Sequence, residues 1–126
     1  TCYTAVDGGD EPCYMQWLIG PNDNQKLRAM YREGMLQLRA DEMLLEGAFT
    51  RPAFRGKGVM AEAMAHIAEK GRDAGARWVI TFVKEDNIAS LKGCQKAGFE
   101  PYMLKYTQWQ FFKSTSRFEV LPAGRV

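Results

Sequence analysis

Hydrophobic residues occur along the chain in two kinds of run, and the first kind predicts strands. Residues 1–6 and 13–20 are rich in β-branched and aromatic side chains, and the Gly-rich segment 7–12 separates them. This pattern is typical of a β-hairpin. Residues 42–50 are a mostly apolar run that ends before Pro52, and residues 77–83 are apolar enough to be buried on both faces of a sheet, so we predict that both are central strands.

The second kind of run repeats at three- and four-residue steps and predicts helices. We expect an amphipathic helix from Asn24 to Arg39, whose apolar positions are Leu27, Met30, Tyr31, Met35 and Leu38. A second helix, through residues 60–73, has an apolar face that consists of Met60, Ala63, Met64, Ile67 and Gly71. Its opposite face is charged and includes His66, so we expect this histidine to be a solvated surface residue.

Capping and turn residues delimit the rest of the chain. Asn87 is a favourable N-cap and Gly98 a favourable C′ residue, which predicts a short helix over residues 88–97. Residues 100–122 are rich in aromatic side chains, and we predict a final hairpin that turns near residues 113–116. No internal repeat, low-complexity tract or linker interrupts this order.

Composition and charge favour one globular domain that covers residues 1–126. The chain has 126 residues, of which 46% are hydrophobic, enough for one modest core. The net charge is +2 and the basic residues are scattered, which argues against a nucleic acid or a membrane as partner. No apolar stretch approaches the roughly 20 residues of a membrane-spanning helix, and no leader segment opens the sequence. We therefore expect a cytoplasmic protein.

The chain has only three cysteines and one histidine, so few residues could form a disulfide bond or bind a metal ion. If residues 8–11 form the hairpin turn, Cys13 lies several positions along the ladder from Cys2, too far for a disulfide bond. Reduced cysteines agree with a cytoplasmic location. With no CxxC pair and only His66 as an imidazole ligand, we expect no metal ion.

The segment FRGKGVM, residues 54–60, carries the clearest sign of a ligand site. It lies between a predicted strand and a predicted helix. Gly56 and Gly58 let the backbone curl around a bound group, and free N–H groups at the start of the helix attract negative charge. Because Arg55 and Lys57 add positive charge, we predict an anion-binding loop.

Two common phosphate-binding motifs fit this loop poorly. A P-loop needs GxxxxGK followed by Ser or Thr, whereas Gly58 follows Lys57 here. The stretch GKGVMA satisfies the GxGxxA pattern of dinucleotide-binding folds, but residues 52–55 separate its first glycine from the strand. The chain is also too short for the two halves of such a fold.

The same loop resembles motif A of the GNAT superfamily of N-acetyltransferases, which reads Gln/Arg-x-x-Gly-x-Gly/Ala. Arg55 and Gly58 match this motif, and Met60 stands at the position of its last glycine or alanine. A second segment, EDNIASLKGCQKAGFE, resembles a later part of the family, in which Asn precedes a helix that ends in Gly-Phe. The matching residues are Asn87, Gly98 and Phe99. The resemblance covers roughly the whole chain.

The resemblance implies an α/β (α+β) fold with a mixed, bent sheet, helices on both faces and a splay between two central parallel strands. Residues 42–50 and 77–83 would be these strands. Acetyl-coenzyme A would bind in the splay as a co-substrate, with its pantetheine on the first strand, its pyrophosphate on the loop and further contacts from the last helix. The residues implied are Ala48, Phe49 and Thr50; Arg55, Gly56, Lys57, Gly58, Val59 and Met60; and Asn87 and Ser90.

The reaction implied is direct transfer of the acetyl group to an amine of a small molecule or a protein within a ternary complex. A general base must take a proton from the amine. Glu46 and Glu42 share one face of a strand, where partial removal from water would suit a general base. Many members of the family have a tyrosine as general acid where this chain has Cys94, which is either a core residue or the acid itself. Tyr102 or Tyr106 near the end of the chain is the other candidate for the acid.

Members of the family usually have a strand and two helices before the hairpin that opens this chain, and nothing precedes Thr1 here. Three explanations stay open: the sequence is a fragment or a processed product, the helix over 24–39 supplies the missing wall of the acceptor pocket, or a second subunit in a homodimer covers it. An alternative function is a non-catalytic module that binds acetyl-coenzyme A or another protein. Met60, Cys94 and the missing front end favour this alternative, whereas the intact loop favours binding in either case.

Overall fold

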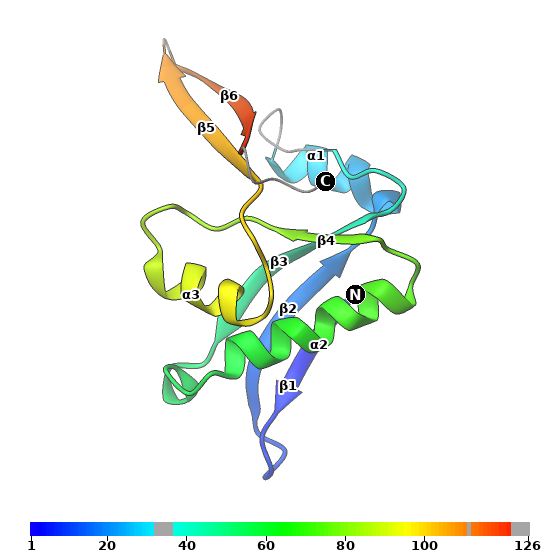
Figure 1. Ribbon diagram of the computed structural model, residues 1–126, viewed down its shortest axis with the longest axis vertical. Helices are drawn as coiled ribbons and strands as arrows, with labels where there is room; N and C mark the ends of the chain where they lie inside the picture. Colours follow the sequence, from blue (N-terminus) through cyan, green and yellow to red (C-terminus); the bar gives the residue numbers. More distant parts are fainter. Residues whose placement is uncertain (32–36, 111, 122–126) are drawn as a thin grey trace. The chain divides into compact units, whose positions relative to one another are not determined.

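The computed structural model describes residues 1–31, 37–110 and 112–121 (Figure 1). The chain divides into two units, one formed by Thr1–Pro21 and Leu38–Phe99 and the other by Asn22–Gln37 and Glu100–Val126. In the described residues, the first unit contains a four-stranded sheet and two α-helices, and the second contains an α-helix and a hairpin.

The sheet of the first unit runs in the order β1-β2-β3-β4. Its strands are β1 (Cys2–Val6), β2 (Pro12–Ile19), β3 (Glu42–Thr50) and β4 (Trp78–Thr81). β1 pairs with β2 and β2 with β3 in antiparallel fashion, whereas β3 and β4 are parallel. The predicted first hairpin and the predicted class, a mixed sheet with adjacent parallel strands in an α/β fold, are therefore confirmed.

β4 differs from its prediction, because it is the edge of this sheet and not a central strand. It has four residues, of which Ile80 alone is buried, and Phe82 beyond its end is 40% exposed. The apolar run 77–83 thus reflects one buried position flanked by more exposed ones, instead of two buried faces. β3 is central as predicted, and both Leu44 and Leu45 in it are buried.

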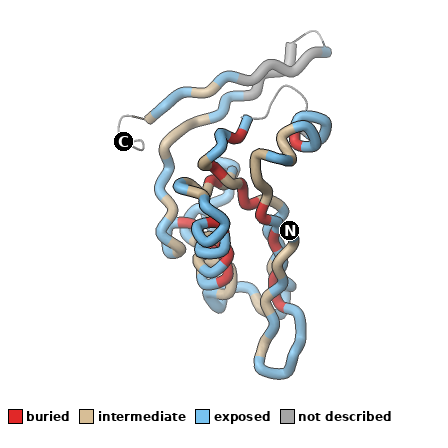
Figure 2. The backbone as a smooth tube through the Cα atoms, turned by 90° about the vertical axis from the view of Figure 1, so that its right-hand side faces the viewer, coloured by how far each residue is buried: buried red, intermediate tan, exposed pale blue. Residues whose placement is uncertain are grey.

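Helix α2 (Val59–Asp73) packs against β2, β3 and β4. Its buried residues are Ala63, Met64, Ile67 and Gly71, which all belong to the predicted apolar face. Met60 from that face is half-buried, and His66 is exposed, as predicted. Figure 2 shows that the buried residues of α2 and of the sheet lie mainly where the two face each other.

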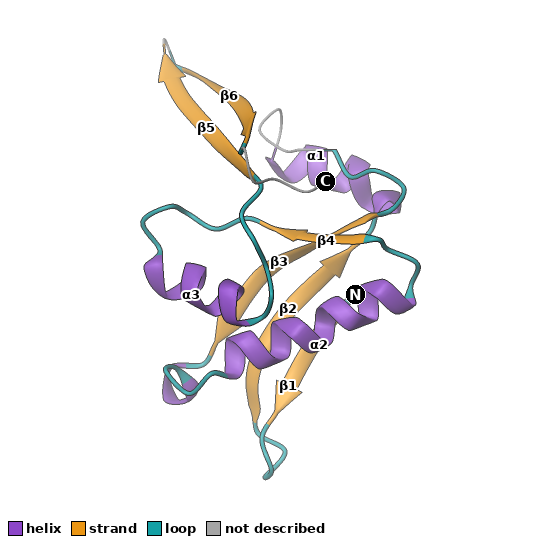
Figure 3. Cartoon of the chain, in the orientation of Figure 1, coloured by secondary structure: helices purple, strands orange, loops and turns teal. Residues whose placement is uncertain are grey.

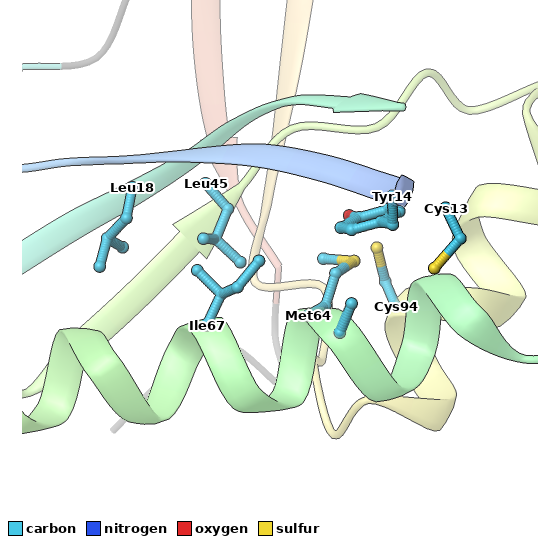
Figure 4. Close-up of a cluster of buried hydrophobic side chains, with 8 residues drawn as sticks. Cys13, Tyr14, Leu18, Leu45, Met64, Ile67 and Cys94 are labelled. Carbon is cyan, nitrogen blue, oxygen red and sulfur yellow. The ribbon is translucent and has the colours of Figure 1, made fainter. Parts of the chain in front are cut away.

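One cluster of side chains joins α2 to the sheet (Figure 4). Ile67 lies beside Leu18 and Leu45, and Met64 lies beside Tyr14 from β2. Farther along α2, a Cβ atom on Gly71 would lie 2.9 Å from Cγ2 of Val79 in β4. The glycine therefore allows the closest approach of helix and strand, which explains why the apolar face ends in a residue without a side chain.

Helix α3 (Ile88–Lys96) begins and ends close to the predicted capping residues. The side chain of Asn87 accepts a hydrogen bond from the backbone N–H of Ser90 at 3.2 Å, as an N-cap does. Gly98 has a φ of +96°, the left-handed conformation of a C′ glycine. α3 packs against α2. Short 3₁₀ helices are η1 (Pro21–Asp23) and η3 (Pro52–Phe54).

The second unit contains α1 (Asn24–Tyr31), β5 (Met103–Gln110) and β6 (Lys113–Val120) (Figure 3). The predicted helix over 24–39 is confirmed only at its start. Residues 37–39 are not helical, and residues 32–36 lie outside the described residues. The basic and apolar residues that continue the helical spacing therefore do not by themselves keep residues 37–39 in a helix.

The predicted final hairpin exists, but its predicted turn at residues 113–116 is wrong. Gln110 pairs with Lys113, so Lys113 already belongs to a strand, and Phe112 just before it has a φ of +63°. Ser116 lies within β6, opposite Thr107.

Replacement of Met64 by Ala tests the packing of α2. Met64 is 1% exposed, so we expect Met64→Ala to lower the free energy of unfolding by about 2–5 kcal/mol. The matched control is Met30→Ala, because Met30 in α1 is 67% exposed and its truncation should change stability by less than about 0.5 kcal/mol. Denaturant unfolding of both variants measures this difference, and equal losses would contradict the described core.

Candidate active site

The parallel strands β3 and β4 separate partway along β3. Their paired residues run from Glu42 and Trp78 to Leu45 and Thr81, where β4 ends. The last pair is closed by a hydrogen bond of 3.1 Å from Oγ1 of Thr81 to the carbonyl of Leu45. β3 continues through residues 46–50 without a β4 partner among the described residues. The carbonyl of Thr50 accepts a hydrogen bond from the side chain of Arg55, and the other backbone groups of this stretch that face β4 are available to a bound extended chain.

A β-bulge lies at the point where β3 leaves β4. On one side of it Trp17 pairs with Glu46, and on the other Met15 pairs with Phe49. One residue of β2 therefore faces two residues of β3, and Gly47 adopts a φ of +69°, as in a bulge that begins with glycine. This bulge was not predicted from the sequence, although a glycine inside an apolar strand is a known signal for one.

The loop between β3 and α2 contains two glycines in the left-handed conformation. Gly56 and Gly58 have φ values of +75° and +77°, and a Cβ atom on either would meet nothing within 4 Å. Gly58 is also the N-cap of α2, with no side-chain hydrogen bond to the first turn. The loop is therefore open on the side where side chains would otherwise project, as the sequence predicts.

The backbone N–H groups of this loop and of the first turn of α2 are unpaired. Within the described chain, none of the amides of residues 56–61 donates to a protein group, and the first amide that does is that of Glu62, to the carbonyl of Gly58. A row of such donors at the positive end of a helix dipole binds phosphate oxygens well. The residues present thus fit the pyrophosphate of coenzyme A.

Two cations flank the loop and contact aromatic rings. Nε of Arg55 donates to the carbonyl of Thr50 at 2.9 Å, and its guanidinium lies 5.7 Å from the centre of the Phe49 ring. Nζ of Lys57 lies 6.0 Å from the ring centre of Phe54. Because these partners carry no charge, the positive charge of both side chains remains available to an anion at the loop.

The predicted contacts from the last helix lie at the N-terminus of α3. Oδ1 of Asn87 accepts the hydrogen bond from Ser90 that caps the helix. The same side chain keeps its amide N–H groups as donors. Asn87 is exposed and Ser90 half-buried, so both are accessible at the end of the helix that follows β4.

The two candidate carboxylates lie in different surroundings. Glu46 is half-buried next to the bulge, opposite Trp17. Glu42 is 1% exposed at the start of β3, and its Oε1 accepts the backbone N–H of Arg39 at 2.8 Å. At about 3.3 Å per residue, four positions place them roughly 13 Å apart along the strand. The structure thus brings Glu46, but not Glu42, to the place where β3 and β4 separate.

Cys94 lies in the core between α3 and the sheet (Figure 4). It is 7% exposed, and burial raises the pKa of its thiol, which therefore stays protonated at neutral pH. Burial, and to a lesser extent Cys94, raises the pKa of Tyr14 far above its ordinary value. The Tyr14 hydroxyl donates to Oε1 of the buried Gln16 at 2.8 Å, a polar pair that was not predicted from the sequence.

Met60 does not fill the anion-binding loop. A Cβ atom on Gly93 of α3 would lie 3.1 Å from the Sδ atom of Met60, so the methionine side chain packs against that glycine. The larger side chain in motif A is thus accommodated between the first turn of α2 and α3. It leaves the free amides of the loop exposed to solvent.

Metal and membrane features are absent from the described part of the chain. Among residues 1–31, 37–110 and 112–121, no three His, Cys, Asp or Glu side chains are grouped so that they could hold a metal ion. No helix in the same ranges has both the length and the apolar character needed to cross a bilayer. The cysteines Cys2, Cys13 and Cys94 are free.

Three solved structures share this fold. The aminoglycoside acetyltransferase AAC(6')-Iy, in complex with a bisubstrate analogue of coenzyme A and acetylneamine, has a TM-score of 0.60 at 24% identity, over 79% of this chain and 61% of that chain. A candidate phosphinothricin N-acetyltransferase has a TM-score of 0.61 at 18% identity, over 93% of this chain and 67% of that chain. The aminoglycoside 6'-N-acetyltransferase AAC(6')-Ih from Acinetobacter baumannii has a TM-score of 0.52 at 18% identity, over 79% of this chain and 62% of that chain.

Sequence comparison identifies the family. No match is found among curated proteins. Residues 13–100, more than half of the chain, match the family model described as an acetyltransferase (GNAT) domain. This range includes the separated strands, the glycine loop and the capped helix α3. The chain therefore belongs to the family of GNAT acetyltransferase domains.

Proposed function

We propose that the chain transfers an acetyl group from acetyl-coenzyme A to an amine, with residues 1–126 acting as one acetyltransferase domain. The observation that carries this proposal is the row of unpaired amides at residues 56–61, next to the strand stretch that has no β4 partner. The chain spans 61% of the length of AAC(6')-Iy, so its activity and acceptor are inferred from this chain's own residues. A small-molecule amine is the favoured acceptor, and a protein amine is the other candidate.

Coenzyme A would be held by three groups of residues. The amides of residues 56–60 would take the pyrophosphate, with Arg55 and Lys57 adding charge. The backbone of Ala48–Thr50 would pair with the pantetheine as an added strand does. Asn87 and Ser90 would contact the same molecule from the start of α3.

Glu46 is the proposed general base. It lies on β3 beside the bulge. A backbone N–H group that the bulge leaves without a partner in the ladder can donate a hydrogen bond to the developing oxyanion there. Glu46 would take a proton from the acceptor ammonium or amine, directly or through one water. The amine nitrogen then forms a bond to the acetyl carbon and the carbon–sulfur bond breaks. The nitrogen loses its extra proton as the amide forms, and the departing thiolate takes up one proton, directly or through water, so that coenzyme A leaves as the thiol. Glu42 is assigned no chemistry because its carboxylate is engaged with the backbone of Arg39.

A non-catalytic module that binds acetyl-coenzyme A is the second candidate function. The observation in its favour is Cys94, which is buried in the core at the position where many relatives have a tyrosine. Release of the coenzyme A thiol, measured with a panel of amines, distinguishes the two. An enzyme releases thiol only when an amine is present, whereas a binding module releases none.

The glycine loop is tested by Gly58→Glu. The new carboxylate would repel phosphate and cover the free amides, so we expect the affinity for acetyl-coenzyme A to fall at least about a hundredfold, or about 2.7 kcal/mol. Calorimetric titration measures the affinity, with ATP and NAD as comparison ligands.

The matched control for this variant is Gly75→Glu. Gly75 also has a positive φ, +96°, and open space around its Cβ, so a side chain strains the backbone in both variants and meets no neighbour in either. It follows the C-terminus of α2, a helix of 15 residues and thus about 22 Å long. Gly75→Glu should keep the wild-type affinity. An equal loss in both variants would mean that strain, not the anion site, accounts for the effect.

The base is tested by Glu46→Gln, which keeps the shape of the side chain and removes its charge. We expect kcat/KM for the best amine to fall at least about tenfold, within the usual range for loss of a general base, and the affinity for acetyl-coenzyme A to stay unchanged. The fall should shrink at high pH, where the amine is already neutral. A variant with the wild-type pH profile would exclude Glu46 as the base.

The role of Cys94 is tested by Cys94→Ala. Its place in the core predicts a modest loss of stability and a kcat within about threefold of wild type, because core truncation by one small atom leaves the site intact. Thermal unfolding and steady-state kinetics measure the two effects. A large drop in kcat with unchanged cofactor affinity would instead assign the proton to the Cys94 thiol.

A further inference from the structure

An exposed apolar surface surrounds the bulge on the side of the sheet that faces away from α2. Tyr14, Leu18 and Leu45 point toward α2 (Figure 4), so the residues that alternate with them point to the other face. Met15 and Trp17 on that face are 37% and 46% exposed. Large apolar side chains that are left this open on adjacent positions indicate a binding surface.

The surface continues from β2 onto β3. Phe49, which is 48% exposed, is directly opposite Met15, and Glu46 is directly opposite Trp17. Side chains at directly opposite positions of an antiparallel pair lie on the same face, about 5 Å apart at Cβ. Met15, Trp17, Glu46 and Phe49 thus form one contiguous group, which we call the bulge surface.

The indole of Trp17 lies over the bulge itself. A Cβ atom on Gly47 would be 3.3 Å from Cδ1 of Trp17, so the ring occupies the space that the glycine leaves open. A side chain at position 47 would force the indole away. The aromatic ring is therefore beside both the proposed base Glu46 and the end of the paired part of β3.

The bulge surface is continuous with the anion-binding loop. The Arg55 guanidinium lies 5.7 Å from the centre of the Phe49 ring and donates to the carbonyl of Thr50. Phe49 thus borders both regions. A molecule on the bulge surface would be next to the strand on which the proposed function places the thioester.

Resting on the proposed function, we propose that the bulge surface is the acceptor subsite and that it takes a primary amine carried by an aromatic or other apolar body. Trp17, Met15 and Phe49 offer apolar contact to the body. The Trp17 ring and the Glu46 carboxylate both attract the ammonium group. The one carboxylate suits one ammonium group, not a polycation, and it repels an amine that also carries acidic groups.

The experiment compares acceptors that differ in one feature. Thiol release from acetyl-coenzyme A is measured with 2-phenylethylamine, with ethylamine, which lacks the ring, with neamine, a polycation, and with glutamate, an anionic amine. Burial of a phenyl group is worth roughly a 10–100-fold gain. We expect this gain in kcat/KM for 2-phenylethylamine over ethylamine, and lower values for neamine and glutamate.

Two variants and a control assign the gain to Trp17. Trp17→Ala should remove most of the advantage of 2-phenylethylamine over ethylamine, and it should lower the value for ethylamine less, because ethylamine loses only the attraction of the ring for its ammonium group. The affinity for acetyl-coenzyme A should stay unchanged. Trp17→Phe, which keeps a ring and guards against misfolding, should retain part of the advantage. The control is Phe112→Ala, since Phe112 is fully exposed in the hairpin of the second unit, and it should change none of these values.

The outcomes separate the subsite from the function. Faster turnover of neamine, glutamate or ethylamine would overturn the subsite and leave the function standing. If no amine is acetylated, the function fails, and the subsite is judged by the shift of the Trp17 indole N–H resonance on titration with 2-phenylethylamine. No shift would overturn it. A concentration-dependent dimer that Trp17→Ala abolishes would show that a second copy of the chain covers the surface instead.

Discussion

Packing of α2 against β2 and β3 determines where the ligand-binding groups of the first unit lie. Met64 and Ile67 are buried among residues of both strands, so the helix cannot rotate without exposing them. Its first turn therefore stays at the end of the loop that leaves β3. The direction of the helix dipole and the direction in which the free amides point follow from this contact alone.

The unpaired amides of residues 56–61 lower the stability of the ligand-free protein. Gly58 has no side chain with which to cap the helix, and Ser or Asp at such a position contributes about 1 kcal/mol to helix stability. A ligand that supplies acceptors recovers this free energy, which adds to its affinity and raises the stability of the bound form. The missing cap and the proposed affinity for phosphate are thus two effects of the same residue.

Most elements of the first unit could be predicted from sequence because local signals and burial agree there. The face of α2, the cap of α3 and the first hairpin follow from spacing and capping residues alone. The edge position of β4 could not be predicted, since an apolar run does not reveal how many neighbours a strand has. The left-handed conformation of Phe112, just before β6, was not predicted, because phenylalanine is not a usual turn former.

In the candidate site, too, residues with a local sequence signal could be predicted, whereas residues whose role depends on strand pairing could not. Gly56 and Gly58 are recognisable because their conformation demands glycine. Glu42 and Glu46 look equivalent in a strand of period two, and only the hydrogen bond to Arg39 and the bulge distinguish them. Trp17 had no signal at all, because its relation to Gly47 depends on the register of two strands far apart in sequence.

The contact between Met60 and Gly93 links two positions that would otherwise vary independently. While methionine occupies position 60, a side chain at position 93 would press on its sulfur, and while glycine occupies position 93, a small residue at position 60 would leave a gap. Substitutions at these two sites are therefore expected to be non-additive. A protein with Met60 could evolve toward the small residue that is usual at position 60 most easily if a larger residue replaced Gly93 at about the same time. Packing therefore constrains the order in which these two substitutions can occur.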